Sequence, residues 1–368
     1  MAIHIPSFIQ SLIPYRPGKP IEEIVREYGI TQVTKLASNE NPLGPSPKAM
    51  EAAQLALPDS ALYPNGGKTI REVLAKHYGL TIEEVIAGSG SEGVMNNVMR
   101  TFLVEGDEVL TSEATFGGFY VLAHAMGLDL KLAPAKEYRY DLDAIAARIT
   151  AKTRLIYLAN PNNPTGSYFT SAKLIDFLDK VPEDVLVIYD EAYYDFAVDD
   201  CPDYPSLLTS RRKNVITLRT FSKSHGLAGL RIGFATASPE IIGMMLKVKL
   251  PFEPSGVAQA AGIAAIDDTE FLKRTIEVNR KGRTQWKAAF DELGVRYLAT
   301  AANFYCTIHE TPEAAEQITT AMEREGIIVR NLAGFGLPNC VRISIGTQEQ
   351  NERGILALKE VLESVHVA

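Results

Sequence analysis

Short apolar segments alternate with helix-like segments along the middle of the chain. The periodic pattern of TIREVLAKHYG (69–79), EGVMNNVMRTFLV (92–104), YVLAHAMG (120–127) and DLDAIAARI (141–149) predicts helices. The runs EEVIAG, DEVLTSE, DLKLAPA, LIYLAN, VLVIYD and VITLRT predict strands. Apolar strands that alternate with helices indicate an α/β fold in which a mostly parallel sheet is covered by helices on both faces.

The last third of the chain has a different pattern. A long charged segment (270–294) predicts a helix, and NFYCTIHE and VRISIGT predict strands of a smaller α+β domain. The N-terminal stretch is rich in proline, which predicts an arm packed across the domains. We therefore expect an arm at 1–38 that joins the small domain, a large domain at 39–255 and a small domain at 256–368.

Composition narrows the class of protein. At 368 residues the chain has room for two or three domains, and its net charge of −8 argues against nucleic acid or an anionic membrane as a partner. The cysteines, Cys201, Cys306 and Cys340, show no paired spacing, which fits a reducing compartment. With no long apolar run, the sequence predicts a soluble cytoplasmic protein without a membrane anchor. The six histidines lack metal-ligand spacing, so no metal site is expected.

A glycine-rich turn follows the first predicted strand. Residues 88–93, GSGSEG, match the G-x-G-x-x-G fingerprint of dinucleotide sites, and Glu113 lies where an acid would bind the ribose. Any tight strand-to-helix turn also needs glycine, and the N–H groups at a helix start can bind another phosphate. The turn alone leaves these three interpretations open.

Reactive side chains follow three predicted strands. LIYLA leads into NPNNPTG (160–166), VLVIY ends at Asp190, and VITLRTF leads to Ser222 and Lys223. Ligands of open parallel sheets bind at the carboxyl ends of strands, so these segments are expected to face one pocket. A partly desolvated lysine can bond to an aldehyde, and a buried carboxylate can hold a pyridine nitrogen protonated. Asp190 taken alone can also be a helix cap.

Three arginines suggest sites for anions. Arg231 follows Lys223 by eight residues, and its fork of donors suits a phosphate, to which Ser222 adds a hydroxyl. Arg330 and Arg342, in the predicted small domain, are candidates for gripping an anionic substrate group. The alternative for each is an ordinary surface position.

Motifs of one enzyme family occur in order along the chain. They are NENPLGPSP (39–47), ANPNNPTG (159–166), DEAYYDF (190–196), SKSHGLAGLRIG (222–233) and CVRISIGT (340–347). These motifs resemble those of class II, fold-type I pyridoxal-phosphate aminotransferases, most closely the histidinol-phosphate aminotransferases. The resemblance runs from PYRPGKP (14–20) to GTQEQNERGI (346–355), nearly the whole chain. It implies the fold of that family and pyridoxal 5′-phosphate as the cofactor.

The resemblance implies a role for each matching residue around the cofactor. Lys223 would be the Schiff-base lysine and proton shuttle, and Asp190 the partner of the pyridine nitrogen. Tyr193 and Asn163 would hold O3′, and Phe116 would stack on the ring, where the family usually has tyrosine. The cofactor phosphate would be bound by Gly90, Ser91, Glu92, Ser222 and Arg231, with Tyr63 reaching it from the neighbouring subunit of a homodimer.

The resemblance also implies a substrate site. Its residues would be Tyr15, Asn39, Asn163, Arg330 and Arg342. The chain departs from its relatives at Arg16, which replaces an apolar residue, and at Glu253, which is expected to place a carboxylate near the pocket wall.

These roles imply a ping-pong transamination in histidine biosynthesis, from histidinol phosphate to 2-oxoglutarate. Within the fold, an aromatic amino-acid aminotransferase is the nearest alternative and a threonine-phosphate decarboxylase a more distant one. The hypothesis of a nicotinamide-dependent dehydrogenase depends on GSGSEG and Glu113 alone, and it assigns no role to Lys223 or Asp190.

Overall fold

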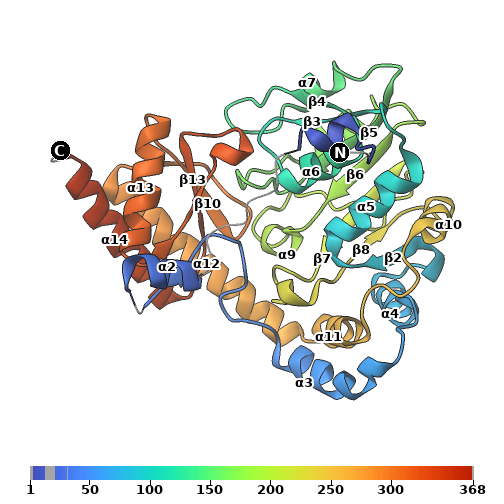
Figure 1. Cartoon of the computed structure of the whole chain (residues 1–368), viewed down its shortest axis with the longest axis horizontal. Coiled ribbons are helices and arrows are strands. Elements are labelled where there is room, and N and C mark those ends of the chain that lie inside the picture. Colours follow the sequence, from blue (N-terminus) through green and yellow to red (C-terminus); the bar gives the residue numbers. More distant parts are fainter. Residues whose placement is uncertain (1–2, 13–20, 31, 367–368) are drawn as a thin grey trace.

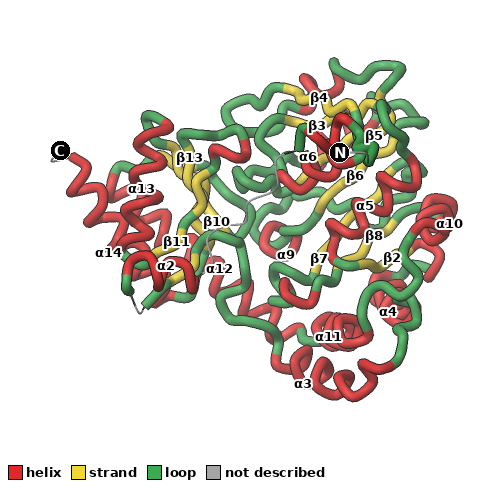
Figure 2. The backbone as a smooth tube through the Cα atoms, viewed as in Figure 1, coloured by secondary structure: helices red, strands yellow, loops and turns green. Residues whose placement is uncertain are grey.

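The chain folds into a large part and a smaller part. The computed structural model describes residues 3–12, 21–30 and 32–366. Figures 1 and 2 show the smaller part, built mainly from the C-terminal third, beside the large part, in which helices surround a central sheet. Among the described residues, no helix is long and apolar enough to cross a membrane.

The large part is built on a seven-stranded sheet. Its strands are, in spatial order, β2 (Val85–Gly88), β8 (Gly233–Thr236), β7 (Val215–Thr220), β6 (Leu186–Asp190), β5 (Thr153–Ala159), β3 (Glu108–Ser112) and β4 (Asp129–Ala133). Within this sheet β8 alone runs opposite to the others, because it pairs antiparallel with both β2 and β7. The carboxyl ends of β2, β5, β6 and β7 therefore meet at one edge.

Helices cover both faces of this sheet (Figure 1). One face packs on α5 (Gly90–Phe102), α6 (Gly117–Ala125) and α10 (Pro239–Val248), and the other on α4 (Lys68–Tyr78), α7 (Leu142–Ala146), α8 (Ser171–Leu178) and α11 (Gly256–Ile266). In β5, Leu155 and Tyr157 face the first group, and Ile156 and Leu158 face the second. Burial on both faces explains the continuous apolar runs of the central strands β5 and β6. The predicted α/β fold class is confirmed.

The smaller part holds an antiparallel four-stranded sheet. Its strands are β12 (Arg330–Asn331), β13 (Cys340–Ser344), β10 (Phe304–Ile308) and β9 (Arg296–Tyr297). The helices α12 (Thr269–Leu293), α13 (Pro312–Arg324) and α14 (Gln348–His366) belong to this part. Trp286 and Phe290 of α12 are fully buried in its core. The long charged helix predicted at 270–294 is therefore present as α12, and its apolar side packs on the small sheet.

The N-terminal segment contacts both parts. The short helix α1 (Ser7–Gln10) lies beside α6, whereas α2 (Ile21–Tyr28) lies next to the smaller part (Figure 1). Strand β1 (Thr34–Lys35) pairs in parallel with β11 (Ile327–Ile328). The next helices, α3 (Pro47–Ala56) and α11, pack on each other in the large part. The domain limits at 38 and 255 stay predictions. Because α11 begins at Gly256 and packs on α3, this helix lies with the large sheet.

Candidate active site

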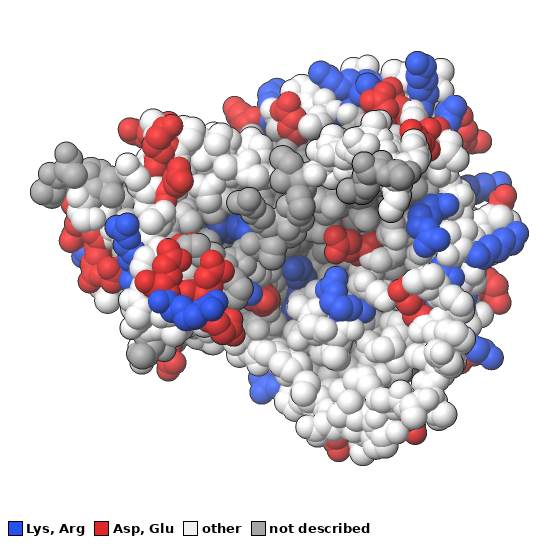
Figure 3. All heavy atoms as spheres, viewed as in Figure 1, with Lys and Arg blue, Asp and Glu red and all other residues white. Residues whose placement is uncertain are grey.

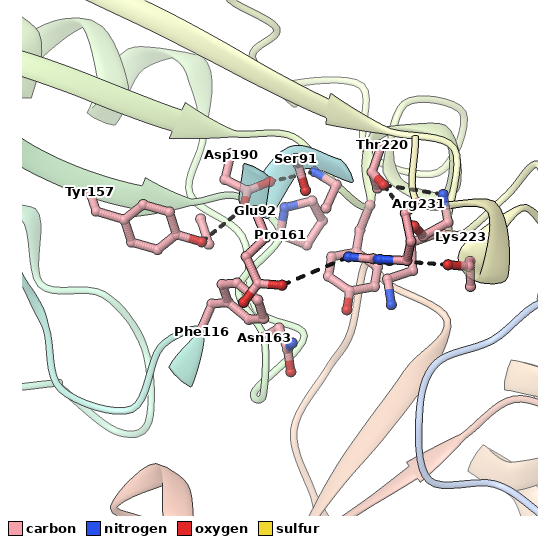
Figure 4. A pocket seen from close by; sticks show the side chains of 15 residues that line it. Ser91, Glu92, Phe116, Tyr157, Pro161, Asn163, Asp190, Thr220, Lys223 and Arg231 are labelled. Carbon is pink, nitrogen blue, oxygen red and sulfur yellow. Dashed lines mark hydrogen bonds and ion pairs between the residues drawn. The ribbon is translucent and has the colours of Figure 1, made fainter. Parts of the chain in front are cut away.

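A pocket opens at the carboxyl ends of β5, β6 and β7. The register sets Ala159 beside Asp190 and Asp190 beside Leu218, so the three strands end together. Figure 4 shows the side chains that line the pocket. From the predicted cofactor site, the lining includes Ser91, Glu92, Phe116, Asn163, Asp190, Tyr193, Ser222, Lys223 and Arg231.

Asp190 lies at the end of β6 and faces this pocket. Its side chain is buried, and its two oxygens accept hydrogen bonds from the Tyr157 hydroxyl (2.8 Å) and the Ala192 N–H (3.0 Å). Burial raises the pKa of Asp190 to about 6, although both hydrogen bonds act in the opposite direction. No cation among the described residues lies within ion-pair distance of this carboxylate. Asp190 is therefore a buried acid suited to a cationic partner in the pocket.

Tyr193 is held by a residue from far away in the sequence. Asn39, at a left-handed φ of 55°, donates from Nδ2 to the Tyr193 hydroxyl (2.9 Å). Ser344 fixes Asn39 in turn, because its hydroxyl donates to Asn39 Oδ1 (2.8 Å) and accepts from the Asn39 N–H (2.9 Å). Since the Tyr193 hydroxyl accepts from Asn39, its own O–H remains available as a donor. Lys223 Nζ lies 5.7 Å from the centre of the Tyr193 ring.

A cradle for an anion lies where α5 begins. Gly90 has φ of 81°, and a Cβ there would lie 3.0 Å from Arg231 Nη2. Gly233 of β8 lets α5 start close to the sheet, because a Cβ at 233 would lie 2.7 Å from the carbonyl carbon of Gly90. The helix N-terminus, Arg231 and the Ser222 hydroxyl thus converge on one side of the pocket. Glu92 lies 3.8 Å from Arg231, and both side chains are about half exposed.

The two predicted substrate arginines lie on one face of the small sheet. Arg330 and Arg342 are opposite each other in the β12–β13 register, which brings their side chains together. Arg342 donates to Asn163 Oδ1 (2.5 Å) and to the Ala37 carbonyl (2.6 Å), so it contacts a residue that lines the pocket. The ring of Phe335 lies near both guanidinium groups, at 5.8 Å and 5.9 Å from its centre.

Some predicted site residues are not brought to this pocket. Tyr63 is 82% exposed and stacks on Phe252, with ring centres 4.4 Å apart. Glu253 follows Phe252 in that region and does not line the pocket, so the expected carboxylate at the pocket wall is absent from this chain's own site. Tyr15 and Arg16 lie outside the described residues.

Sequence reasoning missed Tyr157 and Thr220, which also line the pocket. The Thr220 hydroxyl donates to Ser222 Oγ (3.0 Å) and accepts from the Ser222 N–H (3.1 Å). One signal could have identified Tyr157: it brings a hydroxyl into an otherwise apolar strand. It lies two residues before Ala159 and therefore on the same face of that strand. Thr220 lies two residues after Leu218 in β7, on the same face of the strand, and Leu218 pairs with Asp190.

The dinucleotide interpretation of GSGSEG does not match the sheet. The turn follows the edge strand β2, whose neighbour β8 is antiparallel, and α5 leads on to β3 near the opposite edge. The fingerprint requires a βαβ unit with adjacent parallel strands. Glu113, which follows β3, is therefore separated from Gly90 by the width of four intervening strands. Among the described residues, no group of three acidic, histidine or cysteine side chains is arranged to hold a metal ion.

A buried ion pair joins the strand ends that carry Asp190 and Lys223. Arg219 Nη2 lies 2.7 Å from Glu191 Oε2, with side-chain exposures of 9% and 0%. The Arg219 guanidinium also lies 3.4 Å from the centre of the Tyr194 ring. Glu191 follows β6 directly, and Arg219 belongs to β7, so the pair fixes these strand ends to each other.

Replacement of Arg219 by methionine is expected to destabilise the fold by about 3–5 kcal/mol, because it leaves the Glu191 charge buried without its cation. Thermal unfolding followed by circular dichroism measures the change. The matched control is Asp143→Ala, which breaks the exposed ion pair with Lys180 (3.0 Å) and is expected to leave the melting temperature unchanged. Equal melting temperatures for Arg219→Met and the original chain would contradict the assigned role of the buried pair.

Comparison with known proteins places this site in a family. A family model described as aminotransferase class I and II matches residues 31–358. The crystal structure of histidinol-phosphate aminotransferase from Sinorhizobium meliloti, in complex with pyridoxal-5′-phosphate, superposes with a TM-score of 0.90, at 29% identity and with 98% of each chain covered. An aspartate aminotransferase from Thermus thermophilus shares the fold (TM-score 0.85, 21% identity). The chain belongs to the class I and II aminotransferase family, as predicted.

Sequence relatives define the branch of that family. The histidinol-phosphate aminotransferase of Anaeromyxobacter sp. is 42% identical over 97% of this chain and 99% of its own length. That of Moorella thermoacetica is also 42% identical, over 96% of this chain and 92% of its own. Within the family, this chain is a member of the histidinol-phosphate aminotransferases.

Proposed function

We propose that this aminotransferase uses pyridoxal 5′-phosphate to move the amino group of histidinol phosphate to 2-oxoglutarate. The observation that carries the proposal is the placement of Lys223 and Asp190 in one pocket beside an anion cradle. The names of its sequence relatives and the cofactor in the S. meliloti structure support it.

The pocket offers a matching group for each part of this cofactor. The cradle at Gly90, Ser222 and Arg231 suits a phosphate dianion. Asp190, buried without a cation, suits a protonated ring nitrogen. Tyr193, whose hydroxyl already accepts from Asn39, has its proton left for a phenolate oxygen. We therefore assign cofactor binding to these residues.

Lys223 is the group assigned to move the proton. When bound, pyridoxal 5′-phosphate supplies an aldehyde for the amino group and a ring that takes up the electron pair of the broken Cα–H bond. With the cofactor bound, the Lys223 amine would take the proton from the substrate Cα as general base and, as general acid, return it at the cofactor's former aldehyde carbon, C4′, on the other side of the substrate nitrogen. Asp190 keeps a positive charge on the ring nitrogen favourable, and Phe116 supplies an apolar face to the ring.

The arginines of the small sheet are assigned to the substrate's anionic groups. Histidinol phosphate carries a phosphate and 2-oxoglutarate two carboxylates, and planar guanidinium groups bind either anion with paired donors. Arg330 and Arg342 lie opposite each other and so can serve both substrates in turn. Asn163, which contacts Arg342, lines the pocket and connects the anion site to the cofactor site.

Substrate comparison tests this function. Single-turnover spectra of the cofactor-loaded enzyme should show amino-group transfer from histidinol phosphate with kcat/KM at least about tenfold above that from phenylalanine or tyrosine. A second half-reaction should then regenerate the enzyme with 2-oxoglutarate. A preference for the aromatic amino acids would support the aromatic aminotransferase alternative, and transfer from neither donor would overturn the proposal.

We propose further that the active enzyme is a homodimer in which Tyr63 reaches the partner's cofactor site. Tyr63 belongs to an exposed apolar surface, and Figure 3 shows few charged side chains over α3 and α11 in the same region. A monomer rarely exposes so many large apolar side chains together. This surface consists of Met50, Leu55, Leu57, Leu62, Tyr63, Leu250 and Phe252.

Hybrid dimers test the shared site. Tyr63→Ala and Lys223→Ala are each expected to be strongly impaired, but co-expression of the two should restore roughly a quarter of the original activity, because half of the dimers would hold one intact site. Light scattering measures the mass of the assembly. If Tyr63→Ala is fully active, or if the co-expressed mixture has only the summed activity of the two variants, Tyr63 does not act across the dimer.

We also propose a cytoplasmic location. The three cysteines are all buried free thiols, a state that a reducing compartment preserves.

A further inference from the structure

Both oxygens of the Asp190 carboxylate are held by uncharged donors. The Tyr157 hydroxyl donates to Oδ2 and the Ala192 N–H to Oδ1. Tyr157 is fully buried in β5, and its ring stacks on Phe119, with centres 4.5 Å apart and planes at 15°. Two fixed partners define the plane of the carboxylate, and Figure 4 shows Tyr157 pointing at Asp190 from the side away from Lys223.

The Tyr157 phenol is restricted to the role of donor. Burial and then the charge of Asp190 keep the pKa of Tyr157 well above its ordinary value, so the proton stays on its oxygen. In the described part of the chain the phenol makes no other hydrogen bond. A buried hydroxyl without an acceptor is costly, so Asp190 is the acceptor that Tyr157 requires.

The absence of charge on this donor matters for the site. An arginine or protonated histidine in the place of Tyr157 would neutralise Asp190 from behind. A phenol fixes the carboxylate and leaves its negative charge available on the pocket side. The other titratable groups that act on Asp190 are Glu191, next to it in the chain, and Lys223, across the pocket; Tyr140 lies nearby on the Tyr157 side.

We propose that Tyr157 is a positioning residue of the reaction: its uncharged O–H holds the Asp190 carboxylate in place and leaves that charge directed at a cationic ring nitrogen in the pocket. This inference rests on the proposed function. Tyr157 acts through Asp190 and need not touch the cofactor's reacting atoms.

The test is Tyr157→Phe, which keeps the ring and its stack on Phe119 and removes only the hydroxyl. In the cofactor-free protein, the pH at which Asp190 takes up its proton should rise by about one unit or more, because a hydrogen bond to the ionised form is lost. Infrared titration measures this, with the Asp190 band identified by its absence in Asp190→Asn. At pH 8 Asp190 is ionised in both proteins, and there the affinity for pyridoxal 5′-phosphate should fall by about tenfold because the carboxylate is no longer held in place.

Tyr140→Phe is the matched control. Tyr140 is a partly buried tyrosine whose hydroxyl bonds to Thr115 (2.7 Å) and the Ala159 N–H (3.2 Å) but not to Asp190. Tyr140→Phe is expected to leave the pH at which Asp190 takes up its proton unchanged. A shift equal to that of Tyr157→Phe would overturn the inference. 3-Fluorotyrosine at position 157, a stronger donor with nearly the same shape, should move the Asp190 titration to lower pH. This second variant decides the question if Tyr157→Phe does not fold.

The two possible failures are distinguishable. If the original chain does not bind pyridoxal 5′-phosphate, the proposed function fails and the role of Tyr157 fails with it. If the original chain binds the cofactor and Tyr157→Phe has the same Asp190 titration and the same cofactor affinity, only the inference about Tyr157 fails.

Discussion

Replacement of Lys223 by alanine is expected to lower kcat with histidinol phosphate and 2-oxoglutarate by at least about ten-thousandfold, because no other amine of the described residues lines the pocket to move the proton. The cofactor-loaded original chain, treated with borohydride and mapped by mass spectrometry, should carry the pyridoxyl group on Lys223. The variant should carry none at this position.

Lys213→Ala is the matched control for this prediction. Lys213 is exposed and precedes the opposite end of β7, so its loss removes a lysine from the same strand region without touching the pocket. It should be as active as the original chain. Turnover by Lys223→Ala, or an adduct on a different lysine, would show that the proton is moved elsewhere.

Asp190→Asn is expected to have the second largest effect. An amide cannot supply the negative charge that makes a protonated ring nitrogen favourable, so kcat should fall at least about a hundredfold. Steady-state rates across pH 6 to 9 measure this on the loaded enzyme. Activity within a few-fold of the original chain would remove Asp190 from the role assigned to it.

The same variant has an opposite effect on the cofactor-free fold. In the folded chain the pKa of Asp190 is about 6, above its ordinary value of 3.8. Its contribution to stability is therefore complete below about pH 4 and is lost as the pH rises to about 6, a total of about 3 kcal/mol. Asparagine has no such dependence, so the stability of Asp190→Asn relative to the original chain should increase over this range and stay constant above it. Melting temperatures at pH 4.5 and 7.5 give the comparison, and a constant difference between the two proteins would contradict the raised pKa.

Much of the large sheet was predictable because its strands are buried on both faces. LIYLAN, VLVIYD and VITLRT are continuous apolar runs with polar residues at their carboxyl ends, and they became β5, β6 and β7. The ends of these strands also place Asp190 and Lys223 in one pocket. Strand β8 was not predicted, since its four residues begin with a glycine inside a loop-like segment. The predicted helix at 141–149 ends at Ala146.

The finer parts of the site depend on contacts that sequence spacing does not contain. Asn39 meets Tyr193 across 154 positions, and Ser344 meets Asn39 across 305. From the sequence alone Tyr157 looks like an ordinary buried strand residue, because an aromatic ring fits the apolar run LIYLA and the sequence does not show what its hydroxyl contacts. Tyr63 is exposed and does not line its own chain's pocket, so one chain does not reveal where it acts.

Gly233 sets a limit on how this enzyme can vary. Gly233 does not itself line the pocket, but any larger residue there would press on the backbone nitrogen of Ser91, which does, and on the carbonyl carbon of Gly90, and would push the start of α5 outward. The anion cradle is thus protected by a residue more than a hundred positions away, on a neighbouring strand. Directed evolution for new substrates would therefore target Arg330 and Arg342, which are assigned to the substrate, whereas variants at position 233 are expected to lose the anion cradle and with it the activity.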